Sequence, residues 1–215
     1  MGWQLTSNVR FCIASDRVIF LDVARDRYFA LPAAAGNAFR HWLARPDASP
    51  VPGIVARLQA ERLVVATDGR SDLSNPPIVA AANALGRAAH AKGLGTAVDV
   101  TRSLMRVHMS LRRTGLLGTL ARLRPDLDSD QDAGDIVRQH AAVFVEARRR
   151  LPLAASCLPD SLAMLDYLRR RGLGASIVFG VTGTPFRAHC WVQLGDEILN
   201  DALDHVAPFT PILQR

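Results

Sequence analysis

Apolar and polar positions change their spacing along the chain, and the first third predicts strands followed by helices. Short runs rich in β-branched and aromatic residues are separated by polar turns, a pattern typical of strands. We expect these strands at Val9–Ile13, Val18–Asp22 and Arg27–Leu31. Pro32 ends the third run, and apolar residues then recur at helical spacing over Ala33–Leu43. A second helix is expected from Ile54 to Leu63, so the pattern indicates a small sheet packed on helices.

A polar stretch at Thr67–Pro77 predicts a boundary between two domains. It combines Gly, Ser, Asn and Asp with two prolines and holds a single bulky apolar residue, Leu73. We therefore expect one domain at 1–77 and another at 78–215. Beyond the boundary, helical spacing is expected over Ile78–Leu123, with breaks near Gly93–Gly95 and Gly115–Gly118, and over Ile136–Arg150, after an acidic loop at Arg124–Asp132.

The last third has the most regular pattern. Leucines at 158, 162, 165 and 168 repeat with a period of about 3.6, so we expect a helix that begins at Cys157 and ends at Gly172. Pro159 and Asp160 fit its first turn, where proline leaves no donor unpaired and a carboxylate complements the helix dipole. Strands are expected at Ala175–Val181, Ala188–Leu194 and from Glu197 to about Asp201. Together the elements predict the α+β class.

Composition narrows the classes of protein. The 215 residues are 49% hydrophobic and 21% charged, which is typical of a folded globular chain. No apolar run is long enough for a membrane span, and the first residues lack the basic and apolar regions of a signal peptide. Three cysteines at wide spacing argue against a disulfide framework and against a CxxC zinc site. We therefore expect a cytoplasmic protein without membrane contact.

The net charge of +6 is concentrated in the middle of the chain. Residues 86–150 carry 12 basic and 7 acidic residues. Such an excess fits an acidic partner, a nucleic acid or a solvated helical face, and the solvated face is favoured. Lys92 is the single lysine and no GxxxxGK[ST] loop is present, which excludes a Walker-type nucleotide site.

Cys157 is the first candidate for chemistry. A cysteine at a helix N-terminus has its thiolate stabilised by unpaired backbone N–H groups and by the dipole, and this is what a nucleophile needs. The same N–H groups can donate to an oxyanion during acyl transfer. Taken alone, Cys157 fits a small buried apolar residue equally well.

His189 lies downstream on a predicted strand and strengthens the catalytic interpretation. It shares one face with Trp191 and Gln193, while Cys190 points to the opposite face and is expected in the core. For that reason a zinc site of Cys157, His189 and Cys190 is disfavoured. The order Cys, His, Asp is that of papain-like and transglutaminase-like enzymes, in which an acid orients the imidazole.

Asp201 is the candidate acid, and Asp204 is the alternative. If the last strand runs on to Asp201, a three-residue loop around Gly195 places Asp201 opposite His189. A two-residue Gly195–Asp196 turn places it opposite Cys190 instead, on the wrong face.

Two segments carry a family resemblance. SCLPDSLAMLDYLRRRG and FRAHCWVQLGDEILND, which begin at Ser156 and Phe186, resemble the leader-peptidase domain of lasso-peptide B proteins, a transglutaminase-like cysteine protease family. The resemblance covers roughly residues 151–203. It implies Cys157 as nucleophile, His189 as general base and acid, and Asp201 as the orienting acid. It implies neither a cofactor nor a metal.

The N-terminal segment VIFLDVARDRYFALPAAAGNAFRHWL, from Val18, is similar to precursor-peptide recognition elements of the pyrroloquinoline-quinone chaperone type. That resemblance implies a winged-helix-like domain of three strands and helices, on which a leader peptide adds as a further strand. The leader-binding residues would be Arg27, Tyr28, Phe29, Ala30 and Leu31. Only about twenty residues separate Trp42 from Val64, which implies an abbreviated helical groove.

The combined expectation is a recognition domain followed by a transglutaminase-like, papain-like α+β domain that cleaves the leader from a lasso-peptide precursor. The implied partners are the precursor peptide and an asparagine-synthetase-like cyclase, with no nucleic acid. Two alternatives stay open. A transglutaminase-like acyltransferase forms the same acyl-enzyme but passes it to an amine. A non-enzymatic winged-helix regulator that binds DNA would use the helix at Ala33–Leu43, whose basic groups Arg40 and His41 lie near its end.

Overall fold

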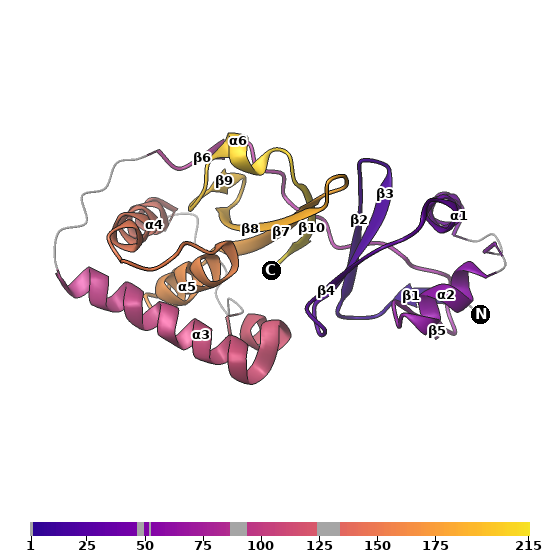
Figure 1. The fold of residues 1–215 in the computed structure, drawn as a ribbon, viewed down its shortest axis with the longest axis horizontal. Coiled ribbons are helices and arrows are strands. Elements are labelled where there is room, and N and C mark those ends of the chain that lie inside the picture. Colours follow the sequence, from indigo (N-terminus) through magenta and orange to yellow (C-terminus); the bar gives the residue numbers. More distant parts are fainter. Residues whose placement is uncertain (1, 47–49, 52, 87–93, 124–133) are drawn as a thin grey trace.

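The computed structural model describes residues 2–46, 50–51, 53–86, 94–123 and 134–215. Two lobes lie side by side, one formed by the N-terminal strands and helices and the other by the rest of the chain (Figure 1). The structure belongs to the mixed α+β class, as the apolar pattern predicts.

The N-terminal lobe contains the sheet that the sequence predicts. Its strands follow the order β2-β3-β4, and α1 comes directly after Pro32. The elements are β2 (Val9–Ala14), β3 (Arg17–Asp22), β4 (Arg27–Ala30), α1 (Ala33–Ala44) and α2 (Ile54–Ala60). The second helix ends at Ala60, before Leu63. A separate pair, β1 (Gly2–Leu5) with β5 (Val64–Thr67), is antiparallel and was not predicted.

Both faces of the N-terminal sheet are buried. Phe11 and Phe20 on one face pack against Phe39 and Trp42 of α1. Apolar residues of the other face, Cys12, Ala14, Ile19, Leu21 and Val23, belong to the core of the C-terminal lobe. The sheet is therefore sandwiched between its own helices and the second lobe, which explains why its central strand, β3, is apolar at consecutive positions.

The stretch expected as a linker packs on the N-terminal lobe. Leu73 is buried in the same cluster as Phe11. The amide of Asn75 pairs with the backbone of Phe11, donating to its carbonyl at 2.6 Å and accepting from its N–H at 3.3 Å. The domain boundary at residue 77 stays a prediction.

The C-terminal lobe is built on a sheet of order β10-β7-β8-β9-β6, in which only the short pair β6–β9 is parallel among the described strands. Its strands are β6 (Asn83–Ala84), β7 (Ser176–Thr182), β8 (Arg187–Leu194), β9 (Glu197–Ile198) and β10 (Thr210–Gln214). Its helices are α3 (Leu94–Arg122), α4 (Gly134–Arg149), α5 (Cys157–Arg169) and α6 (Leu203–Val206). The three long helices share a core with one face of the sheet, and α6 shares a smaller core with the other.

The helix expected from Ile78 is wrong over residues 78–86. This segment is extended and contains β6, because its backbone groups pair with the turn and strand after β8. The Ala82 N–H donates to the backbone carbonyl of Asp196, and the Leu85 N–H donates to that of Ile198. That pairing outweighs the helical propensity of its alanines. Residues 87–93 and the acidic loop at 124–132 lie outside the described residues. The expected break at Gly115 is present as a kink with φ 66°.

The two lobes meet closely near the turn between β7 and β8. A Cβ on Gly183 would lie 2.4 Å from the carbonyl oxygen of Ala14 at the end of β2, so only glycine allows this approach. Phe186 of the same turn lies against Tyr28 of β4, with ring centroids 5.6 Å apart. None of the described helices is both long and apolar enough to cross a lipid bilayer.

Candidate active site

Cys157 is the first residue of α5, as the sequence predicts. Ser156 precedes it in an extended conformation. Asp160 in the first turn accepts hydrogen bonds from the Ser156 N–H at 3.1 Å and from Arg148 Nε at 2.8 Å, which holds this end of the helix in place. The thiol of Cys157 therefore lies at the positive end of the helix dipole, and Cys157 is exposed while Cys12 and Cys190 are buried.

His189 lies in β8, between Asp201 and a set of aromatic rings. Its Nε2 is 2.5 Å from Oδ2 of Asp201, which leaves Nδ1 for Cys157. The rings of Trp191 and Phe209 lie 6.2 Å and 5.1 Å from the imidazole, measured between centroids. The residue opposite His189 in β7 is Gly180, where a Cβ would come within 2.9 Å of Trp191 and Phe209. Glycine at that position lets the aromatic wall close on the imidazole.

The electrostatics of Cys157 and His189 favour an ion pair. Hydrogen bonds from the Cys190 thiol and then from His189 lower the pKa of Cys157 to about 4, although partial burial opposes the charge. Asp201 and then Cys157 raise the pKa of His189 to about 9, again against burial. Over the interval between these two values the pair is a thiolate beside an imidazolium.

We expect the alkylation rate of Cys157 to show this ion pair directly. Iodoacetamide reacts with the thiolate, so its rate should rise through the low pKa of Cys157 and be nearly flat from roughly pH 5 upward. Cys12 should react slowly, because burial raises its pKa to about 12. Peptide mapping after timed labelling measures both. A rate at Cys157 that climbs steeply through pH 8–9, or earlier labelling of Cys190, would contradict the ion pair.

Asp201 reaches His189 by a route that the strand pattern did not predict. Leu194 pairs with Glu197, so the turn between β8 and β9 has two residues, Gly195 and Asp196. The expectation that Asp201 needs a three-residue loop, and that the strand runs to Asp201, is wrong. β9 ends at Ile198, and the side chain of Asn200 accepts a hydrogen bond from the Val192 N–H at 2.7 Å in place of a strand carbonyl. The chain leaves the ladder there and turns Asp201 toward His189.

Asn200 and Ser161 connect the helix that carries Cys157 to the strand that carries His189. Asn200 donates to Ser161 Oγ at 2.9 Å, and Ser161 Oγ donates to the Cys190 carbonyl at 3.3 Å. Ser161 is fully buried. Neither residue was singled out from the sequence, although both stand in the two segments that carry the family resemblance. Their bonds fix α5 against β8 and so position the thiol relative to the imidazole.

His205 is a further member of the site that sequence reasoning missed. Its Nδ1 lies 2.8 Å from Oδ1 of Asp201, and its ring centroid lies 4.8 Å from that of His189. Burial raises the pKa of Asp201, but hydrogen bonds from His189, His205 and the Ala202 N–H outweigh it and lower that pKa to about 2. Asp204, the alternative acid, is exposed and accepts a hydrogen bond from the His205 N–H. The feature of the sequence that could have pointed to His205 is its spacing of four residues from Asp201.

The same three side chains are the ones that could hold a metal. His189, Asp201 and His205 offer ligand atoms within 4.8 Å of one another, and imidazole and carboxylate are donors that zinc accepts. A metal there would have to displace the bonds between Asp201 and both histidines. This grouping differs from the zinc site of Cys157, His189 and Cys190 that the sequence argued against.

Cys190 is buried, as expected, but it does not point away from the site. Its hydrogen bond to Cys157, followed by burial, raises the pKa of its thiol far above the usual range. The inner face of β8 packs on α5, and Cys157 stands at the start of that helix, so an inner-face residue reaches it. Strand alternation predicted correctly that Cys190 lies on the inner face of β8. It did not predict that this face contacts the start of α5, where Cys157 stands.

Tyr28 brings the N-terminal lobe to the edge of this site. Its ring packs on the C-terminal core and on Phe186, which precedes His189 by three residues in the chain. Burial raises the pKa of Tyr28, and the nearby negative charges of Asp26 and of the Cys157 thiolate raise it further. Strand β4 is therefore within electrostatic reach of the Cys157 thiolate.

The residues expected to bind a leader lie on an edge strand. β4 pairs with β3 alone among the described strands, and the other edge of that sheet, β2, lies against β10. The Leu31 N–H donates to the Val18 carbonyl and so points inward, toward β3. Since inward and outward groups alternate in an antiparallel pair, the N–H groups of Tyr28 and Ala30 face away from the sheet. Leu31 is buried, and Tyr28, Phe29 and Ala30 are half-buried.

A groove continues from the end of β4. It has a volume of about 470 Å³ and lies between the start of β3 and helix α1, with Leu31, Gly36 and Asn37 among its lining residues. Arg40 at its rim is bonded to Asp16 and Asn37.

Residues 100–214, more than half of the chain, match the sequence profile of the family described as the transglutaminase-like superfamily. This match includes Cys157, His189 and Asp201. The chain belongs to the transglutaminase-like superfamily. This transglutaminase-like chain is also 40% identical over 48 residues to the microcin J25-processing protein McjB of Escherichia coli.

The similarity to the microcin-processing protein covers 22% of this transglutaminase-like chain and 23% of that protein, so it spans less than a quarter of either. No solved structure matches the chain. The expected resemblance to the lasso-peptide B proteins is thus confirmed as a transglutaminase-like core with a partial similarity to one processing protein.

Proposed function

We propose that this protein is the leader peptidase of a lasso-peptide pathway, with Cys157, His189 and Asp201 as its catalytic residues. The observation that supports this most directly is the chain of contacts from Asp201 through His189 to Cys157, at a helix start inside a transglutaminase-like core. The partial similarity to a microcin-processing protein supports the choice of substrate class.

In the proposed reaction the Cys157 thiolate attacks the carbonyl carbon of the amide that joins leader and core. Backbone N–H groups at the start of α5 donate to the oxyanion. The imidazolium of His189 gives its proton to the departing core amine, which leaves the leader as a thioester on Cys157. His189, now neutral, takes a proton from water, and the hydroxide attacks the thioester, releases the leader as a carboxylic acid and restores the pair of Cys157 thiolate and His189 imidazolium. Asp201 keeps Nδ1 of His189 directed at the sulfur throughout.

The leader is proposed to dock on the outer edge of β4, at Arg27–Leu31. No backbone carbonyl in the described part of the chain accepts from the outward N–H groups of Tyr28 and Ala30, so they can pair with an added strand, and the groove beyond Leu31 can receive side chains at one end of it. Tyr28 and Phe186 connect this edge to the strand of His189. A peptide held there has its following residues near Cys157, which raises their effective concentration at the thiol.

Removing one outward donor should weaken leader binding. We expect Ala30→Pro to lower the affinity for a labelled leader peptide by about tenfold or more, because proline has no N–H to pair while the inward bonds of β4 to β3 stay intact. Fluorescence anisotropy with a leader peptide from the neighbouring reading frames measures the affinity.

Ala30→Val is the matched control, since it keeps the N–H and favours a strand. It should bind the leader as the unchanged protein does. Equal affinity in the proline and valine variants would contradict strand addition at this edge.

The implied partners are the precursor peptide and a cyclase of the asparagine-synthetase type that uses the freed amine. Both would be encoded near this gene. The function is tested by incubating the full chain with that precursor and identifying the products by mass. The DNA-binding alternative has less support, because Arg40 of α1 is engaged with Asp16 and Asn37 rather than free.

A further inference from the structure

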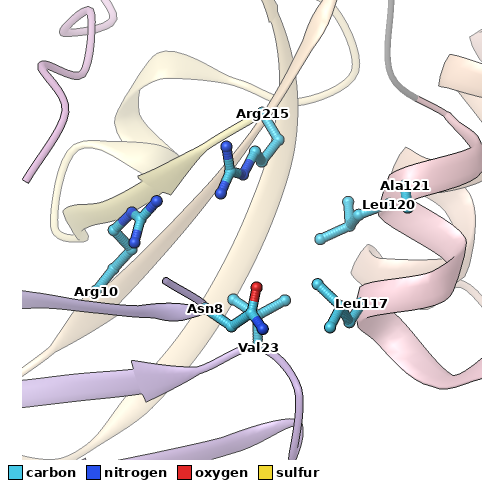
Figure 2. Close-up of a pocket in the computed structure, with 7 residues that line it drawn as sticks. All are labelled: Asn8, Arg10, Val23, Leu117, Leu120, Ala121 and Arg215. Carbon is cyan, nitrogen blue, oxygen red and sulfur yellow. The ribbon is translucent and has the colours of Figure 1, made fainter. Parts of the chain in front are cut away.

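Two arginines converge on a small cavity at the junction of the lobes, away from the Cys157 group. Arg10 of β2 and Arg215, directly after β10, face the same space, with Asn8 near them and Leu117 and Leu120 of α3 across from them (Figure 2). The cavity has a volume of about 40 Å³. At roughly 10–15 Å³ for one water, it holds a group of about three water volumes.

The hydrogen-bonding capacity of Arg10 is only partly used. Its Nη1 donates to the carbonyls of Ser7 and Val9, at 3.0 Å and 2.6 Å, which fixes the plane of the guanidinium. Its Nε is buried and has no hydrogen-bond partner in the described part of the chain. A buried donor without a partner is costly, and an ion or a water is the usual explanation.

The two arginines also lack an acidic side-chain partner in the described part of the chain. Neither Arg10 nor Arg215 forms an ion pair with any acidic residue that the structure describes. Burial, and then the charge of Arg215, lower the pKa of Arg10, so the two guanidinium groups repel each other across the cavity.

We propose that this cavity binds a small oxyanion, a carboxylate or a phosphate, held by Arg10 and Arg215. Guanidinium groups match such anions because their planar N–H donors pair with two oxygens at once. An oxygen in the cavity would accept from Nε of Arg10, and its charge would offset the repulsion. The amide of Asn8 supplies a further donor, and the leucines of α3 exclude water on the far side.

Binding would connect three parts of the fold. Arg10 belongs to the N-terminal sheet, Arg215 follows the edge strand of the C-terminal sheet, and Leu117 lies on α3. The anion is therefore a ligand that stabilises the packing of the N-terminal sheet against the transglutaminase-like core.

The test is thermal unfolding of the full chain in sodium phosphate, sodium acetate or sodium chloride at matched ionic strength. Phosphate or acetate should raise Tm above the chloride value by about 4 °C. A larger response to phosphate assigns a phosphate group, and a larger response to acetate assigns a carboxylate. Because phosphate also stabilises proteins in general, the decisive quantity is the difference between variants.

Arg215→Gln should lose this response, and so should Arg10→Gln. In chloride alone, Arg215→Gln should melt at or above the temperature of the unchanged protein, because it removes the repulsion and breaks no side-chain hydrogen bond to any residue that the structure describes. Arg57→Gln, on the exposed side of α2, makes the same change in charge and should keep the response. A response of equal size in Arg215→Gln, or an equal response to chloride, would overturn the proposal.

Discussion

Cys157→Ala should reduce cleavage of the precursor to the background rate while leaving leader binding unchanged. No other described thiol can replace it, because the pKa of Cys190 and that of Cys12 are both raised by burial or by hydrogen bonding. Leader binding should persist because β4 and its groove belong to the other lobe. Cleavage is followed by mass spectrometry and binding by anisotropy.

Cys190→Ser is the informative companion variant. A serine hydroxyl can still donate to the Cys157 thiolate, so activity should be reduced far less than in Cys157→Ala. Cleavage that survives in Cys157→Ala but is lost in Cys190→Ser would show that the nucleophile is Cys190 and not Cys157.

Asp201→Asn should lower the rate of cleavage by about a thousandfold or more with the fold intact. The carboxylate accepts from Nε2 of His189, holds the imidazole in one tautomer and stabilises its positive charge. An amide in its place favours the wrong tautomer, and the pKa of His189 should fall from about 9 toward its ordinary value. On the alkaline side of the pH profile, the cleavage rate of Asp201→Asn should therefore begin to fall at a lower pH than that of the unchanged protein.

Asp204→Asn provides the control, because Asp204 contacts His205 and not His189. It should retain nearly full activity. A severe loss in Asp204→Asn beside a mild one in Asp201→Asn would transfer the orienting role to Asp204.

The elements that the sequence predicted best are those with strong local signals. Helix α5 combines a leucine repeat with a proline and an acid in its first turn, and its expected start at Cys157 is confirmed. Strands β2, β3 and β4 are bounded by polar turns and were expected within one residue. In both cases the local pattern and the tertiary packing favour the same structure.

Other features depend on partners far away in the chain. Strand β1 pairs with β5, more than fifty residues later, and no local pattern marks that pairing. Residues 78–86 have helical composition but are extended, because backbone N–H groups of this segment donate hydrogen bonds to the carbonyls of Asp196 and Ile198. The place of Asp201 depends on the side chain of Asn200 replacing a ladder bond, which strand alternation cannot anticipate.

The contacts of Cys190, His205 and Tyr28 were hidden for the same reason. Each belongs to a different element, and the packing of α5, α6 and β4 around β8 brings them to the group formed by Cys157, His189 and Asp201. Sequence reasoning named three residues, Cys157, His189 and Asp201, whose catalytic roles stay a prediction, and it missed the residues packed around them.

The central claim is that Cys157 forms an acyl-enzyme with the leader and that water releases it. The most direct measurement is to incubate the full chain with precursor in water enriched in the heavy isotope of oxygen, with a competing amine present. We expect a leader fragment that carries heavy oxygen in its new carboxylate, a core with a free amine, and neither product with Cys157→Ala. A leader joined to the added amine would show an acyltransferase instead, and cleavage by Cys157→Ala would contradict the account.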